Sequence, residues 1–318
     1  MWLCLALAVI LFFVIRWYRE SQTVENLREK YVFITGCDSG FGNQLARQLD
    51  LEGLRVLAAC LTEKGAKELQ RVSTDRLKTT ILDVTSTESI VAATEWVKSC
   101  VGDKGLWGLV NNAGVAHPTA PNEWLTKDDF VKILNVNLIG LIDVTLHMLP
   151  LVKKARGRVV NVASIFGRLS FLGGGYCPSK YGVEAFSDSL RRELHPFGVK
   201  IAIIEPGFFL TGMTNIQTHL DCMRQQWAST PQEVKDSYGE TYFNRCYQLV
   251  KEDMVRRCDT NLYLVTDCME HALISKHPRT RYSAGWDSQF FFVPLSYLPT
   301  AVADLVLTWS QPKPAQAV

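Results

Sequence analysis

The sequence predicts a doubly wound α/β domain built on a parallel sheet, and two observations support this fold class. Short apolar runs recur between residues 31 and 207 without polar alternation, which is typical of strands that helices cover on both faces. Amphipathic stretches separate these runs, and parallel neighbours need crossover connections of that kind. No low-complexity linker or internal repeat interrupts the alternation, so the 318 residues are interpreted as containing one α/β domain, not two.

The expected elements can be placed along the chain in order. After the first strand, residues 43–52 read as a helix with Leu45, Ala46 and Leu49 on one face. The expected strands cover residues 31–35, 55–60, 78–84, 107–113, 157–164 and 199–207. We expect the domain that contains these strands to cover residues 29–285.

The composition excludes several classes of protein. The 47% hydrophobic content is too high for a disordered chain. The 34 basic and 32 acidic residues give a net charge of +2, and a nucleic-acid binder would show a basic excess. The nine Cys form no C-x-x-C pair and the six His form no H-E-x-x-H motif, so we expect free thiols and no metal site.

The N-terminus carries a concentrated apolar run. Residues 2–15 contain no charged residue, and Trp17 and Tyr18 suit a membrane interface. Because no basic residue precedes the run and no A-x-A pattern follows it, residues 1–18 read as a retained membrane anchor, with a cleaved signal peptide as the alternative. The basic residues after the run favour a cytosolic body, but the facing side is left open.

Two further segments are expected to serve the substrate side. Residues 208–260 are poor in motifs and read as an insertion that lines an apolar pocket, with ordinary core packing as the alternative. Residues 286–318 are apolar but contain Pro294, Pro299 and Asp304, which argue against a spanning helix. This segment is interpreted as membrane-associated, and packing onto the core is an equal alternative.

A glycine-rich turn follows the first strand directly. Residues 35–42 read TGCDSGFG and lead into a helix. Glycines let the backbone approach a pyrophosphate, which then lies at the helix N-terminus. A plain strand–helix turn rarely needs three glycines, so this position predicts a dinucleotide site in a Rossmann-type fold.

The choice of cofactor depends on the end of the second strand. An acidic residue there would bind the ribose 2′-hydroxyl, but the chain reads Cys60-Leu61-Thr62-Glu63-Lys64. No Arg stands there to hold a 2′-phosphate, and Asp38 in the glycine turn would repel one. NAD is therefore favoured over NADP, although Lys64 keeps NADP open.

A second constellation points to proton transfer. Tyr176 and Lys180 lie one helical turn apart, so an ammonium would sit beside a phenol and lower its pKa toward the working range. Such a Tyr is a credible general base. Ser164 precedes it at a strand end and can donate to or accept from a substrate oxygen, and Asn137 falls on the preceding helix. For Ser164 alone the alternative is a strand-end cap, and for Asn137 a core amide.

Together these motifs resemble the short-chain dehydrogenase/reductases over about residues 29–215. The turn at 35–42 is similar to the family's T-G-x-x-x-G-x-G, and residues 111–114 are similar to its N-N-A-G element. The segments CDSGFG, GGGYC, SKYGVEAFSDSLRREL and HPRTRYSAGWD resemble its membrane-bound retinol and hydroxysteroid dehydrogenases. Two departures stand out: Ala163 replaces a usual Ser, and Pro178 lies between Tyr176 and Lys180, which requires that it occupy the first turn of its helix.

The resemblance and the motifs assign the expected site residues. The catalytic residues are Asn137, Ser164, Tyr176 and Lys180. The cofactor-binding residues are Thr35, Gly36, Asp38, Ser39, Gly40, Phe41, Gly42, Asp83, Asn112, Lys180 and Thr211. The substrate-binding residues are Ser164, Phe208, Phe209 and Met213.

The expected function is NAD-dependent oxidation of an apolar alcohol, a hydroxysteroid or all-trans-retinol, at the endoplasmic reticulum membrane. Tyr176 would remove the hydroxyl proton, and Asn137 would hold a water that relays it, as the resemblance implies. The alternatives are an NADP-linked carbonyl reductase of the same fold and, more remotely, a non-catalytic lipid-binding or scaffold protein. Membrane lipid is an expected partner, and the family's frequent dimerisation leaves a homodimer open.

Overall fold

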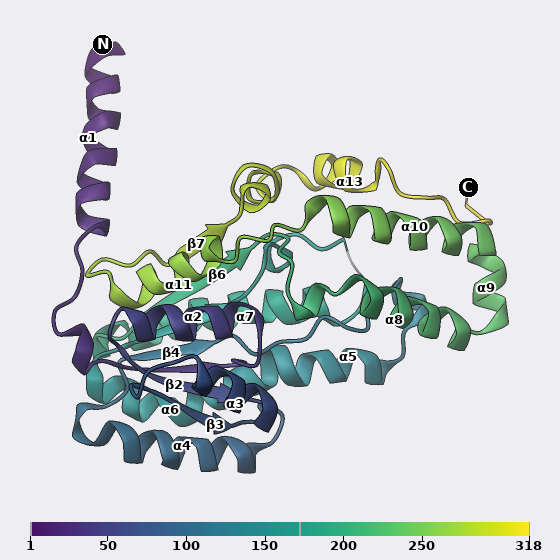
Figure 1. Cartoon of the computed structure of the whole chain (residues 1–318). Coiled ribbons are helices and arrows are strands. Elements are labelled where there is room, and N and C mark those ends of the chain that lie inside the picture. The colour runs from purple at the N-terminus through teal and green to yellow at the C-terminus, as the bar shows by residue number, and fades with distance from the viewer. Residues whose placement is uncertain (1, 172, 318) are drawn as a thin grey trace.

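The computed structural model describes residues 2–171 and 173–317, without the side chains of residues 3, 4, 6, 8 and 253–255 (Figure 1). A seven-stranded sheet in the order β3-β2-β1-β4-β5-β6-β7 forms its centre, and every pairing in it is parallel. The predicted doubly wound fold is confirmed. The strands are β1 Tyr31–Thr35, β2 Arg55–Cys60, β3 Leu77–Ile81, β4 Gly108–Asn111, β5 Arg158–Val162, β6 Lys200–Pro206 and β7 Arg281–Ala284.

Helices connect the strands and extend the chain at both ends. The α-helices are α1 Trp2–Glu20, α2 Gly40–Leu51, α3 Glu63–Arg71, α4 Thr87–Val101, α5 Lys127–Leu134, α6 Leu141–Ala155, α7 Tyr176–Leu194, α8 Ile216–Ser229, α9 Gln232–Tyr238, α10 Glu240–Arg257, α11 Tyr263–Ile274, α12 Val293–Leu295 and α13 Thr300–Thr308. Short helical turns are η1 Leu27–Glu29, η2 Gly102–Lys104, η3 Asn122–Trp124, η4 Asn135–Gly140, η5 Ile165–Gly167, η6 His195–Phe197, η7 Gly212–Thr214 and η8 Ser288–Phe292.

Two apolar layers enclose the sheet. On one face α2 and α11 pack against the strands through residues such as Leu45, Leu49 and Met269. On the other face α4, α6 and α7 do so, with Val97 and Met148 fully buried. Figure 1 shows α2 above strands β4 and β2, and α4 and α6 below these two strands. Because both faces are covered, the strands need apolar side chains on both sides, which is why they show no alternation.

The structure differs from the sequence prediction mainly at the ends of elements. The expected strand over 78–84 ends at Ile81, and residues 82–84 continue as an irregular segment. The helix expected from residue 43 begins at Gly40, so the glycine turn forms its first turn. Strand β7 was not expected, because its four residues RYSA offer no apolar run and it pairs on one side only, with β6.

Helix α1 stands clear of the body (Figure 1). Its 19 residues span about 28 Å at ~1.5 Å per residue, close to the ~30 Å of a bilayer core. Its base is fixed to the body, because the Glu20 carboxylate pairs with Arg279 and its carbonyl accepts a 3.0 Å hydrogen bond from His271 Nε2.

A different helical stretch meets the length and composition of a membrane span. Among the described residues this stretch is Lys127–Ala155, and 39% of its apolar part is buried inside the protein. Val144, Met148 and Val152 on it are fully buried against the sheet. Its apolar character is therefore that of a helix in the core of the fold.

The expected insertion and the C-terminal segment cover one end of the sheet. The insertion forms α8, α9 and α10, which join η3 through aromatic rings: Trp227 packs at a tilt against Trp124 and stacks on Phe243. The C-terminal segment packs Phe292 and Leu307 against the residues beside Ser164. It also exposes large apolar side chains at Trp286, Phe290, Phe291, Tyr297, Leu298, Val302, Leu305, Val306 and Trp309.

Candidate active site

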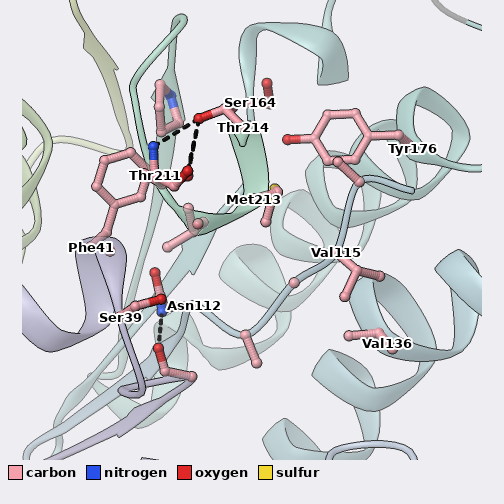
Figure 2. A pocket seen from close by; sticks show the side chains of 18 of the residues that line it. Ser39, Phe41, Asn112, Val115, Val136, Ser164, Tyr176, Thr211, Met213 and Thr214 are labelled. Atoms are coloured by element: carbon pink, nitrogen blue, oxygen red, sulfur yellow. Dashed lines mark hydrogen bonds between the residues drawn. The ribbon is translucent and has the colours of Figure 1, made fainter. Parts of the chain in front are cut away.

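A cavity of about 490 Å³ opens at the carboxyl ends of the strands. In doubly wound folds ligands bind at this edge, beside the point where the strand order reverses, here between β1 and β4. The glycine turn, the ends of β2 and β5, the segment after β4, α7 and the segment after β6 all contribute to its walls. Figure 2 shows side chains from these elements converging on it.

The glycine turn lies tightly against the segment after β4. Gly36 has φ +70°, and a Cβ on it would lie 2.8 Å from the Cα of Ala113. Asn112 Nδ2 donates to the carbonyls of Thr35 and Gly36, at 2.9 and 3.1 Å. The Thr35 hydroxyl accepts hydrogen bonds from the backbone N–H groups of Asn112 and Ala113, at 3.0 Å each. Asn112 therefore holds the turn in shape from behind.

The front of the turn suits a pyrophosphate. Ser39 is the N-cap of α2 and makes no side-chain cap bond to it, so the first N–H groups of this 12-residue helix are left for a ligand. Gly40, with φ +63°, and Ser39 line the cavity. The residues present thus fit a dinucleotide.

Asp38 reaches from the glycine turn to the end of β2. Its carboxylate accepts hydrogen bonds from the backbone N–H of Leu61 at 2.7 Å, the N–H of Thr62 at 3.0 Å and the Thr62 hydroxyl at 2.6 Å. A negative charge therefore lies where an acid at the end of the second strand is needed to bind the ribose 2′-hydroxyl. Asp83, also in the cavity wall, is exposed and closes its own turn with Thr85.

Ser164 and Tyr176 bring two hydroxyl groups together. Ser164 follows β5, is 5% exposed and accepts a 3.2 Å hydrogen bond from the N–H of Phe166. Tyr176 is the first residue of α7, and its hydroxyl points across the cavity toward Ser164 (Figure 2). Pro178 falls in the first turn of this helix, which confirms the placement that its missing N–H requires.

Lys180 lies one turn further along α7 and is buried. Its Nζ donates to the carbonyl of Val162 at 2.8 Å and lies 5.6 Å from the centre of the Tyr176 ring. The ammonium is thus close to the phenol, as the spacing predicted. Burial lowers the pKa of Lys180 to about 8.

The pKa of Tyr176 corrects an expectation. We expected the nearby cation to lower it, but burial raises the pKa of Tyr176 to about 12, and the hydrogen bond with Ser164 offsets this only in part. Both shifts have one cause, because an apolar wall disfavours the phenolate and the ammonium alike. Desolvation of the phenol therefore changes the pKa of Tyr176 more than the nearby Lys180 ammonium does.

Asn137 also differs from expectation. It lies in the π-helical turn η4, and its side-chain Oδ1 accepts a hydrogen bond from the backbone N–H of Val115 at 2.8 Å. Its two N–H groups donate to the Val115 carbonyl at 2.8 Å and to the Ser179 hydroxyl at 3.1 Å. The side chain is 1% exposed and is not part of the cavity wall. Its amide hydrogens are engaged with the protein, so the water-holding role expected for this side chain does not fit its position.

The segment after β6 closes over the turn. Thr211 lies beside Gly40, and its backbone N–H donates to the Thr214 hydroxyl at 2.7 Å. Met213 reaches the middle of the cavity (Figure 2). Phe209 is 3% exposed and packs edge-on against Phe41, with ring centres 5.6 Å apart. Phe209 is thus mainly a core residue, whereas Phe208 belongs to the aromatic wall described next.

Several residues of the cavity were not foreseen from the sequence. Phe166 touches Phe208 and Phe292 through ring pairs at 5.5 and 6.4 Å, which makes an apolar wall from three distant segments. Val115 and His219 line the cavity as well. Tertiary packing alone brings these segments together, so no local pattern could have identified them.

The fold and the site define a nicotinamide-dependent oxidoreductase, and comparison with known proteins agrees. The family model of short chain dehydrogenases matches residues 30–220. The chain is 64% identical to 17-beta-hydroxysteroid dehydrogenase type 6 of Homo sapiens and 63% identical to retinol dehydrogenase 7 of Rattus norvegicus, in both cases over the full length of both chains. A short-chain dehydrogenase/reductase from Burkholderia phymatum, solved in complex with NAD, shares the fold with a TM-score of 0.68 at 20% identity, over 90% of this chain and 97% of that one.

The chain therefore belongs to the short-chain dehydrogenase/reductase family, as its motifs indicated.

Proposed function

We propose that the protein oxidises the hydroxyl of an apolar alcohol, a hydroxysteroid or all-trans-retinol, to the ketone or aldehyde with NAD as cofactor. The observation that carries this proposal is the pair of hydroxyls of Ser164 and Tyr176, which point toward each other in the wall of the cavity that the glycine turn also lines. The relatives named hydroxysteroid and retinol dehydrogenases support the class of substrate.

The side chains divide the work of proton removal. The Ser164 hydroxyl orients the substrate oxygen, and Tyr176 as phenolate takes its proton. Lys180 Nζ, 5.6 Å from the centre of the Tyr176 ring, would stabilise the phenolate and hold the ribose. When bound, the nicotinamide supplies the hydride acceptor, and this chemistry belongs to the cofactor. Asn137 acts as a positioning residue, because it ties the Val115 segment to Ser179 of α7.

The preference for NAD is proposed from Asp38. Its carboxylate lies at the end of β2, held by Leu61 and Thr62, where it would accept a ribose hydroxyl and repel a 2′-phosphate. Lys64, the residue that kept NADP open, has an 85% exposed side chain that lies 3.9 Å from Glu68. The remaining cofactor contacts are proposed for the glycine turn, Asp83, Asn112 and Thr211.

The substrate pocket is proposed to be apolar. Phe166, Phe208 and Met213 line the cavity next to Ser164, and only a substrate with matching apolar surface gains free energy from covering them. A steroid or a retinoid meets this requirement.

We further propose that the protein is held in the endoplasmic reticulum membrane by α1 and touches the bilayer with its C-terminal segment. In Figure 1, α13 lies along the side of the body from which α1 rises. Trp286, Phe290 and Trp309 are 65–82% exposed there, and aromatic side chains of this kind suit the membrane interface. Vesicle flotation tests this. The protein without residues 1–20 should bind vesicles more weakly, and adding Trp286→Ser, Phe290→Ser and Trp309→Ser to this truncated form should abolish binding. Equal flotation of the truncated form with and without these substitutions would refute a lipid contact by this segment.

A homodimer is proposed on the exposed apolar residues of the helices that carry the site. Val131 on α5, Ile139 on η4 and Tyr181 on α7 are 39–53% exposed. Sedimentation of the detergent-solubilised protein tests this proposal, and a monomer at all concentrations would refute it.

The proposed function is tested by turnover in membrane fractions. All-trans-retinol and a 3α-hydroxysteroid should each be oxidised with NAD, and kcat/KM with NADP should be much lower. A strong preference for NADP would indicate the carbonyl-reductase alternative, and no turnover of any apolar alcohol would overturn the proposal. Protease protection of the same membranes shows which side the body faces.

A further inference from the structure

Two histidines form an unexplained polar feature beside the apolar cavity. His117 lies on the segment after β4, and His219 lies on α8 and lines the cavity. Their rings meet edge to face, with centres 4.5 Å apart and planes at 80°. Neither residue belongs to the glycine turn, to the Ser164–Tyr176–Lys180 group or to any motif in the sequence.

The protonation of His117 follows from its partner. Its Nε2 lies 3.1 Å from the carbonyl oxygen of Met213, which can only accept, so Nε2 carries the proton. In a neutral ring Nδ1 is then a bare acceptor. Burial lowers the pKa of His117, and burial together with His117 lowers the pKa of His219 to about 4. Both rings are therefore uncharged at neutral pH.

The two rings leave hydrogen-bonding capacity unused. In the part of the chain that the structure describes, Nδ1 of His117 and Nδ1 of His219 are buried without a hydrogen-bond partner. A buried polar atom without a partner costs about 1–3 kcal/mol. In the same cavity wall Phe208 offers no polar side-chain atom and Met213 only a weakly accepting sulfur. A phenylalanine at position 219 would fill such a wall without this cost. The histidine is therefore better explained by a ligand than by packing.

We propose that His219, supported by His117, is a specificity-determining residue that hydrogen-bonds a second oxygen of the substrate. This inference rests on the proposed function and narrows it to apolar alcohols with a second hydroxyl or ketone. A neutral imidazole has one donor and one acceptor, so the ring serves either oxygen. Charged substrates are disfavoured, because an uncharged ring in an apolar wall offers no counter-charge. An alcohol with one oxygen, such as retinol, enters the cavity but leaves the ring without a partner.

The test compares two steroids that share the reacting hydroxyl. One carries an oxygen at the opposite end of the ring system, and the other lacks it. The protein should prefer the first in kcat/KM by at least about tenfold, equivalent to about 1.4 kcal/mol. The variant His219→Phe should lose this preference through KM and should oxidise the second steroid and retinol as before. The variant His219→Gln, which keeps a donor and an acceptor, should retain part of it.

The controls separate specificity from folding. His195→Phe, at an exposed position on η6, should leave the preference unchanged, and the unfolding temperature shows whether each variant folds. An equal loss of both steroids in His219→Phe, or no preference in the native protein, would overturn the inference.

Direct binding distinguishes this inference from the proposed function. Equilibrium binding of two steroid ketones that cannot be oxidised, one with a second oxygen and one without, needs no turnover. If no alcohol is oxidised, the proposed function fails, whereas the role of His219 stands or fails on this binding difference.

Discussion

The Asp38 carboxylate accepts two hydrogen bonds from Thr62, one from its backbone N–H at 3.0 Å and one from its hydroxyl at 2.6 Å. Asp38 belongs to the glycine turn and Thr62 is the N-cap of α3, so one side chain joins the two parts of the site that we propose to contact a dinucleotide. Gly65 makes room for it, because a Cβ there would lie 2.5 Å from Asp38 Oδ1. The acid at the end of β2 is thus supplied from a different strand–helix turn.

Removing the charge of Asp38 should weaken the discrimination between the two cofactors. Two like charges about 4 Å apart repel by about 1 kcal/mol in water and about 4 kcal/mol near a protein surface. In Asp38→Asn, kcat/KM with NADP relative to NAD should therefore rise roughly tenfold or more. Asp83→Asn is the matched control and should affect both cofactors equally. An unchanged ratio in Asp38→Asn would refute the role of Asp38.

Lys180 should set the pH range of the reaction. Its pKa of about 8 means that it is charged at neutral pH and loses this charge above about pH 8, well before Tyr176, with a pKa of about 12, would ionise unaided. Only the charged ammonium stabilises the phenolate that oxidation requires, so kcat/KM should rise with pH up to about 8 and should stop rising there. Lys180→Met should shift this rise to higher pH and lower the rate at pH 7 by about 10²–10⁴-fold. The exposed Lys132→Met is the control, and an unshifted profile in Lys180→Met would contradict the account.

Asn137 should support activity by stabilising the contact between the Val115 segment and α7, without itself contacting the substrate. Asn137→Ala leaves the Val115 N–H and carbonyl and the Ser179 hydroxyl each without one partner, at a cost of about 1–3 kcal/mol for a buried group left unsatisfied. The unfolding temperature should fall together with kcat, and the exposed Asn135→Ala should change neither. A large loss of kcat at unchanged stability would instead support the direct, water-holding role.

The sequence predicts the fold well where one local pattern determines it. The strand boundaries 31–35 and 55–60 are confirmed to the residue, because buried parallel strands need continuous apolar runs. Strand β7 escaped notice because its pattern is that of a short edge strand, with Tyr282 and Ala284 buried and its other residues half-exposed. Pairing with β6 stabilises it, and such pairing is not visible in four residues.

In the site, too, features that a local pattern determines were predicted, and features that depend on tertiary packing were not. The Tyr176–Lys180 spacing predicts their proximity, because helix geometry fixes it. The balance of pKa effects at Tyr176 depends on how deeply the pocket is buried, and burial is a tertiary property. The place of the Asp38 carboxylate and the meeting of His117 with His219 likewise depend on which segments pack side by side. The local sign of the Thr62 cap was a threonine followed by the acidic Glu63 in the first turn of the helix.

The most direct test of the central claim is NAD-linked oxidation of a hydroxysteroid by Tyr176→Phe, compared with Tyr181→Phe. Both positions lie on α7, but Tyr181 is 44% exposed and outside the cavity wall. Tyr176→Phe should bind NAD as the native protein does and lose about 10²–10⁴-fold in kcat, whereas Tyr181→Phe should keep full activity. Turnover by Tyr176→Phe at the native rate would contradict the account.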